Sequence, residues 1–177
     1  MGEVARIEER HKAPLVTETS ELITFDDFFH AEKDRLIQVM SVITGSRAEA
    51  EDITQEAFLR LFERWETVAK MENPEGYLHR VAMNQFRSRY RRAAVGLRRA
   101  VAIGPPRDVF AEVDDRDLAL RKLGSLSPRQ RAALVLTEAL GYSGQEAGRL
   151  LGIKATTVWA LTHQARTALA TMEDPDG

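Results

Sequence analysis

From Thr24 onward, apolar residues recur at the three- and four-residue spacing of amphipathic helices. The first such stretch predicts a helix that begins at Thr24 or Asp26, either of which can cap it, and stops at Gly45. Its apolar positions are Phe25, Phe28, Phe29, Leu36, Val39, Met40 and Ile43.

A second helix is predicted from about Arg47 to Trp65 and has two contrasting sides. One side is an apolar stripe for a core, made of Ala50, Ile53, Ala57, Phe58, Leu61, Phe62 and Trp65. The opposite side is acidic, with Glu49, Asp52, Glu56 and Glu63. The acidic side is either a solvated face or a docking surface for a basic partner.

A loop from Glu66 to Gly76 precedes a third predicted helix, from about Pro74 to Arg92. Asn73 can cap this helix, with Pro74 in its first position. Its inward positions are Leu78, Val81, Ala82, Phe86 and Tyr90. Its outward positions, at steps of four, three and four residues, are Arg80, Asn84, Arg87 and Arg91.

The last third of the chain predicts a second helical unit over residues 118–172. Ser127-Pro128-x-Gln130 is a capping box for a helix to about Leu140, and Ser143-x-x-Glu146 opens a short helix to Leu151. Gly152 turns the chain into a helix from about Ala155 to Ala170, which completes a helix-turn-helix pattern. One small core is expected from Ala147, Leu150, Leu151, Ile153, Val158, Ala165 and Leu169.

These elements predict an all-α protein with two small helical domains joined by a flexible linker. Glycines, a Pro-Pro step and an acidic run mark the linker. The predicted divisions are a flexible tail at 1–22, a first domain at 23–93, a linker at 94–117, a second domain at 118–172 and an acidic tail at 173–177.

Composition excludes several classes of chemistry. The 177 residues include no Cys, and the four His residues are scattered without metal-ligand spacing. Phosphate-binding loops and nucleophile elbows are also missing. We therefore expect no enzyme activity, no metal and no cofactor. No apolar run nears 18 residues and no signal peptide begins the chain, so a cytoplasmic protein without membrane insertion is expected.

Charge is strongly segregated although the whole chain is near neutral, with 25 Lys+Arg against 27 Asp+Glu. Eight arginines and no Asp or Glu lie between Tyr77 and Arg107. Such a block, interleaved with aromatic rings, is typical of a surface that binds nucleic acid. Alternatively, the arginine block is only a solvated helix face. A helix-turn-helix also occurs in proteins that do not bind DNA.

Three stretches of this sequence resemble the extracytoplasmic function (ECF) group of bacterial sigma-70 factors. The sequences AEAEDITQEAFLRLFERW (48–65) and NPEGYLHRVAMNQFRSRYRR (73–92) resemble sigma region 2. The sequence LSPRQRAALVLTEALGYSGQEAGRLLGIKATTVWALTHQAR (126–166) resembles region 4. The resemblance implies a subunit that binds core RNA polymerase, recognises −10 and −35 promoter elements, melts DNA and initiates transcription.

The resemblance also implies roles for particular residues. Contact with core polymerase is implied for Asp52, Gln55 and Glu56. The loop 66–76 matches the family loop that captures a flipped −10 base. Contact with the opened −10 region is implied for Tyr77, Arg80, Asn84, Arg87 and Arg91.

The recognition helix departs from the family pattern, which is usually richer in basic residues. Trp159, Ala160, Leu161 and Gln164 stand at those positions, so the −35 element is expected to be read weakly or unusually. Either a partner covers Trp159 and Leu161, or Leu161 packs within its own domain. The residues implied in −35 binding are Lys154, Thr156, Thr157, Trp159, His163 and Arg166.

Family members are commonly inhibited by an anti-sigma factor, so such a partner is expected beside polymerase and promoter DNA. Two other classes of function compete with the sigma-factor interpretation. One is a stand-alone helix-turn-helix regulator that binds duplex DNA as a dimer. The other is an adaptor that mimics region 2 and binds only protein.

Overall fold

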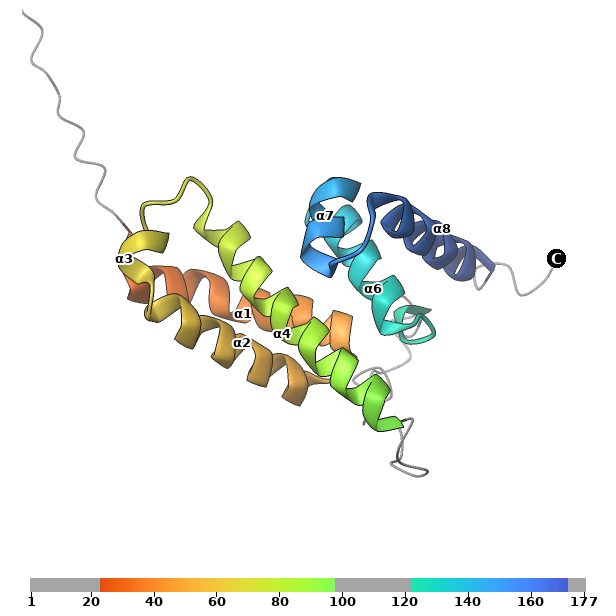
Figure 1. Ribbon diagram of the computed structural model, residues 1–177, viewed down its shortest axis with the longest axis horizontal. Coiled ribbons are helices and arrows are strands. Elements are labelled where there is room, and N and C mark those ends of the chain that lie inside the picture. The colour runs from red at the N-terminus through yellow and green to blue at the C-terminus, as the bar shows by residue number, and fades with distance from the viewer. Residues whose placement is uncertain (1–22, 98–121, 172–177) are drawn as a thin grey trace, which may run out of the picture.

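The computed structural model describes residues 23–97 and 122–171, and the elements in these ranges are helices (Figure 1). The predicted tails at 1–22 and 173–177, and most of the predicted linker, lie outside the described residues. In chain order the elements are α1 (Phe25–Thr44), α2 (Arg47–Phe62), α3 (Trp65–Val68), α4 (Pro74–Leu97), α6 (Pro128–Leu134), the π-helical segment η2 (Val135–Ala139), α7 (Gly144–Leu151) and α8 (Ala155–Thr171).

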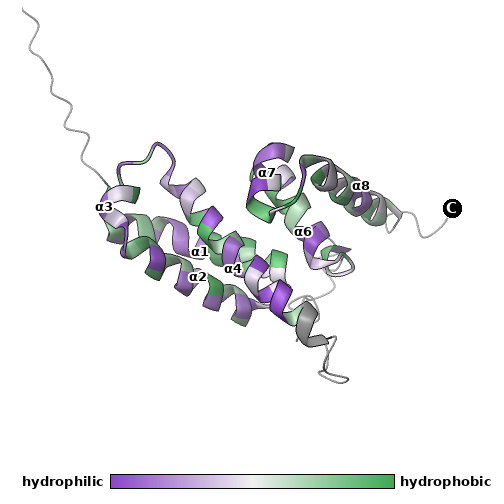
Figure 2. Ribbon diagram, viewed as in Figure 1, coloured by the Kyte–Doolittle hydropathy of each residue, from purple (hydrophilic) through white to green (hydrophobic). Residues whose placement is uncertain are grey.

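Helices α1, α2 and α4 form a bundle whose apolar sides meet in the interior (Figures 1 and 2). Ile43, Ile53, Leu61 and Leu78 have no exposed surface. Each such side chain contributes roughly 1.5–3 kcal/mol through burial. This confirms the predicted core of the first unit for most of its members.

Local signals set the ends of α1 as predicted. The Thr24 hydroxyl accepts a hydrogen bond from the Asp27 N–H at 3.2 Å, which satisfies a free donor of the first turn. Gly45 ends the helix with φ 75°, a left-handed conformation that favours glycine.

The predicted end of the second helix at Trp65 is wrong, and so is the buried position of Phe62. α2 ends at Phe62, Arg64 leaves the helical conformation, and the short α3 begins at Trp65 and continues into the predicted loop. This break turns the Trp65 ring onto Phe28, with 5.2 Å between the ring centroids. Phe62 is left 63% exposed beside Phe25.

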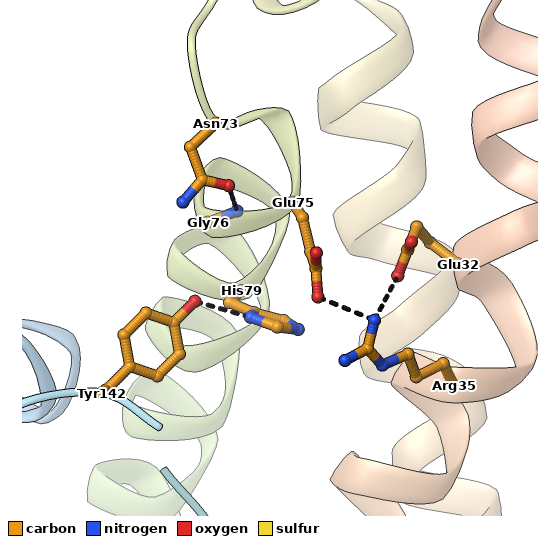
Figure 3. Close-up of polar contacts among 7 residues, drawn as sticks. All are labelled: Glu32, Arg35, Asn73, Glu75, Gly76, His79 and Tyr142. Carbon is orange, nitrogen blue, oxygen red and sulfur yellow. Dashed lines mark hydrogen bonds and ion pairs between the residues drawn. The ribbon is translucent and has the colours of Figure 1, made fainter. Parts of the chain in front are cut away.

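Helix α4 begins as predicted and extends beyond Arg92 to Leu97. The Asn73 side-chain oxygen accepts a hydrogen bond from the Gly76 N–H at 2.7 Å (Figure 3). No proline interrupts the chain until Pro105, so nothing in the backbone chemistry ends the helix at Arg92.

The second unit contains the predicted helix-turn-helix, with both capping boxes confirmed at Ser127 and Ser143. The predicted helix to Leu140 instead changes to π-helical geometry at Val135. Within it, the Thr137 hydroxyl donates to the Ala133 carbonyl at 2.9 Å, a bond that competes with the helix ladder.

The two units pack directly on each other, α7 against α4 and α6 against α1 (Figure 1). Arg131 of α6 is only 6% exposed, and its guanidinium donates to the Ile43 carbonyl at 3.2 Å and the Leu126 carbonyl at 2.9 Å. The predicted separate core of the second unit therefore needs correction. Ala147, Leu150, Leu151 and Val158 join the core of the bundle, whereas Ala165 and Leu169 lie in a small second cluster.

Candidate nucleic-acid interface

The outer face of α4 brings together most of the residues predicted for opened DNA. Arg80, Asn84 and Arg91 are exposed, and Tyr77 is half-buried. The Arg80 guanidinium lies over the Tyr77 ring, 4.8 Å from its centroid. A cation stacked on an aromatic ring presents both charge and an aromatic surface to an unpaired base and its phosphate.

A groove of about 700 Å³ runs between α2 and α4 beside this face. Tyr77, Arg80 and Asn84 line it from α4. The facing side contains Glu56, Glu63 and two arginines, Arg60 and Arg64, which were not among the predicted site residues. The positive charge of these two arginines could have marked them as candidates for DNA binding. Their position opposite Asn84 is evident only from the structure.

Arg87 differs from its neighbours on this face because the second unit covers it. It is half-buried, and a methyl group added to Gly152 would clash with its guanidinium. Its Nη1 donates to the Asn84 side-chain oxygen at 3.3 Å. Packing of the two units thus removes Arg87 from the freely accessible part of the predicted DNA face.

The acidic side of α2 is partly neutralised. Asp52 forms an ion pair with Arg89 of α4 at 3.5 Å, and Glu56 forms one with Arg60 at 2.9 Å. Burial raises the pKa of Glu49, although nearby Arg89 opposes the shift. Gln55 and Asp52 are exposed and Glu56 is half-buried.

An apolar groove of about 500 Å³ lies between α1 and α2, next to these polar residues. Gln55, Phe58, Leu59 and Phe62 are among its lining residues. Leu59 is 55% exposed, so it and Phe62 offer apolar surface that the bundle leaves open. Exposed apolar surface with a polar rim is typical of a protein interaction site. In the sequence, this groove could have been inferred from Leu59, an apolar residue that lies outside the predicted apolar stripe.

The predicted −35 residues lie along α8, as far as Arg166, and just before it. Lys154, Thr156, Thr157 and His163 are exposed, and Arg166 is held by an ion pair with Glu138. Trp159 is 61% exposed, and its indole lies against Gly144 at the start of α7. Leu161 is half-buried and packs on the core, as one of the two sequence alternatives expected.

A polar cluster joins α1, α4 and the loop before α7 (Figure 3). The His79 Nδ1 lies 2.7 Å from the Tyr142 hydroxyl oxygen, and Arg35 forms an ion pair with Glu75 at 3.1 Å. Burial lowers the pKa of His79, Glu75 opposes that shift and Arg35 adds to it. Burial raises the pKa of Tyr142. Within this cluster, the hydrogen bond between His79 and Tyr142 links the two units.

Within residues 23–97 and 122–171, no group of His, Asp or Glu side chains is arranged to hold a metal ion. None of the described helices has the length and apolar character needed to cross a bilayer.

Two family models match the chain, one over each unit. Sigma-70 region 2 matches residues 28–95, and Sigma-70 region 4 matches residues 116–169. These two matches, one over each helical unit, define the class of the chain as a sigma factor of transcription initiation. The chain belongs to the sigma-70 family of RNA polymerase sigma factors, in its ECF group.

Characterised relatives agree with this assignment. The ECF RNA polymerase sigma factor SigE of Mycolicibacterium smegmatis is 32% identical over 157 residues, which cover 82% of this chain and 60% of that protein. The RNA polymerase sigma-E factor of Streptomyces coelicolor is 28% identical over 151 residues, covering 84% of this chain and 85% of that protein. The chain thus spans less than two thirds of the first relative and most of the second.

Solved structures share the fold. The sigma factor RpoE in complex with the anti-sigma factor NepR from Bartonella quintana matches with a TM-score of 0.64 and 21% identity, covering 86% of this chain and 98% of that one. CnrH in complex with the cytosolic domain of CnrY matches with a TM-score of 0.53 and 22% identity, covering 86% and 89%. These likenesses support the two-unit helical arrangement.

Proposed function

We propose that this chain is an initiation subunit that binds core RNA polymerase, recognises −10 and −35 promoter elements and holds the −10 element open. One observation carries the proposal: the groove between α2 and α4 joins three arginines, a tyrosine ring and Asn84 with two glutamates, beside an adjoining apolar groove that shares Leu59. The first groove suits single-stranded DNA and the second suits a protein partner. The protein makes no covalent bond and uses binding energy to separate strands, in the cytoplasm, where it joins the polymerase.

For polymerase contact, we propose the α1–α2 groove together with Asp52, Gln55 and Glu56. Exposed Leu59 and Phe62 supply apolar area, and the acidic rim favours a basic partner through charge complementarity. Substituting Leu59→Ser should weaken binding to core polymerase about tenfold in a competition assay. Exposed Lys70→Ser, outside this groove, is the matched control.

For the −10 element, we propose that an unpaired base and its phosphates lie in the α2–α4 groove. Arg80 and Arg64 neutralise phosphates, Tyr77 offers a ring for stacking, and the Asn84 amide faces a base edge. Arg87 and Arg91 complete the set once the second unit moves away from α4. These contacts offset the few kcal/mol that an unstacked base costs.

For the −35 element, we propose that the exposed first half of α8 enters the major groove. Thr156, Thr157 and His163 offer hydrogen bonds, and Trp159 offers apolar contact to thymine methyl groups. Arg166 contributes after its ion pair with Glu138 opens. An anti-sigma factor is the proposed inhibitor, since the similar RpoE structure named above is in complex with the anti-sigma factor NepR.

A DNA-binding assay on forked −10 DNA, in the presence of core polymerase, tests this proposal. The sigma-factor proposal predicts binding to opened DNA that depends on core enzyme. A stand-alone regulator would instead bind closed duplex as a dimer without core enzyme, and that result would overturn the proposal.

A further inference from the structure

A small cavity lies where the two units meet, between α4, α6 and the turn from α7 to α8. Its volume is about 150 Å³, well below the roughly 300–1,000 Å³ of pockets that hold drug-sized ligands. Arg87, Tyr90 and Arg91 line it from α4, and Arg129 lines it from α6. The cavity thus depends on contributions from both units.

The charge of this cavity is not balanced. Its lining has three arginines and no Asp or Glu, and none of the three forms an ion pair within the described ranges. Arg129 lies over the Tyr90 ring, 5.6 Å from its centroid. Like charges gathered in a partly enclosed space repel each other more strongly than in open water.

Several other arginines of the described ranges have carboxylate partners. Arg35 pairs with Glu75, Arg60 with Glu56 and Arg89 with Asp52. The three arginines of the cavity lack such partners, as Arg64, Arg80 and Arg149 also do within the described ranges, but they gather in one partly enclosed space where the two units meet. A bound anion would remove the repulsion.

We propose that this cavity binds a small free anion with one or two phosphate groups, such as phosphate or pyrophosphate. Guanidinium forks match phosphate oxygens and form charge-assisted hydrogen bonds with them. The volume admits such an ion and excludes a nucleoside beside it. Because the arginines come from both units, the anion stabilises the packed arrangement by mass action.

The proposal gives the anion a regulatory consequence for the proposed function. Arg87 and Arg91 also belong to the predicted −10 surface, so the anion and the opened strand compete for them. Arg129 belongs to none of the proposed polymerase, −10 or −35 sets. A substitution at Arg129 therefore tests anion binding without changing a residue proposed to bind the promoter.

Titration calorimetry of the whole chain with pyrophosphate, at constant ionic strength, tests the proposal. We expect one ion per chain, and at least about tenfold weaker binding for Arg129→Gln. Arg149→Gln, an exposed arginine of α7 outside this cavity, is the matched control and should bind as the wild type does. Circular dichroism checks that both variants keep their helix content, and Arg129→Lys should bind with intermediate affinity.

The outcomes are distinguishable. Equal affinity in the wild type, Arg129→Gln and Arg149→Gln, or no binding at all, would overturn the anion site. So would dependence on Arg129 for a single-stranded oligonucleotide but not for pyrophosphate. Arg129→Gln should still direct initiation with core polymerase in the absence of pyrophosphate. Failure of the wild type in that assay would remove the proposed function and leave the titration result standing.

Discussion

The imidazole of His79 on α4 forms a 2.7 Å hydrogen bond with the hydroxyl of Tyr142, in the loop between η2 and α7. His79 is only 5% exposed and Tyr142 is half-buried, so this bond is partly shielded from water. It fixes the second unit against the helix that carries the predicted −10 residues. Opening the two units must break it.

Tyr142→Phe should lower the free energy of unfolding by about 1–3 kcal/mol, because it leaves a buried ring nitrogen of His79 without its partner. Urea denaturation of the whole chain measures the change. Tyr90→Phe is the control, since the Tyr90 hydroxyl has no hydrogen bond in the described part of the chain, and it should cost much less. Equal losses for the two variants would contradict the role of this bond.

Stability should fall as the pH is lowered below about 6.5, the ordinary pKa of histidine. Burial lowers the pKa of His79 in the folded protein, so below pH 6.5 the unfolded chain takes up a proton that the folded chain does not. Through His79, the free energy of unfolding should fall by at most about 1.4 kcal/mol per pH unit. This fall stops once the pH is below the pKa of His79 in the folded protein. His79→Gln should flatten the dependence measured by urea denaturation from pH 7.5 to 5.5. An unchanged slope in that variant would refute the assignment to His79.

Gly152→Ala should destabilise the protein by about 1–2 kcal/mol from its left-handed backbone alone, and further through Arg87. Gly141→Ala isolates the backbone part, because Gly141 has a similar positive φ and open space around it. Adding Gly152→Ala to Arg87→Ala should cost less than adding it to the wild type, and thermal unfolding measures the wild type, the three single variants and the double variant. Additive effects would mean that the contact between the units is not maintained in solution.

Arg80→Gln should weaken binding to single-stranded −10 DNA in the polymerase complex and lower its salt dependence. Losing one phosphate contact to a single strand reduces the slope of log K against log salt by about 0.7. Fluorescence anisotropy over a salt series measures this slope. Arg35→Gln, on α1 beside Glu75 and outside both grooves, should leave it unchanged.

Local chemistry made much of the fold predictable. Thr24, Ser127 and Ser143 are polar caps followed three residues later by a partner, and each begins a helix as expected. Phe62 was misplaced because the break at Arg64 follows from packing of Trp65 on Phe28, which spacing does not reveal. The inward and outward sides of α4 were also predictable from residue spacing. The packing of the second unit over Arg87 was not. Its contact with Gly152 joins residues far apart in the chain and depends on how the units pack.

In vitro transcription with core RNA polymerase, this protein and genomic promoter fragments tests the central proposal most directly. The account predicts RNAs with discrete 5′ ends that require the wild-type chain and decrease at least about tenfold with Arg80→Ala combined with Asn84→Ala. Core enzyme that initiates with another sigma factor but shows neither binding to this chain nor initiation with it would contradict the account.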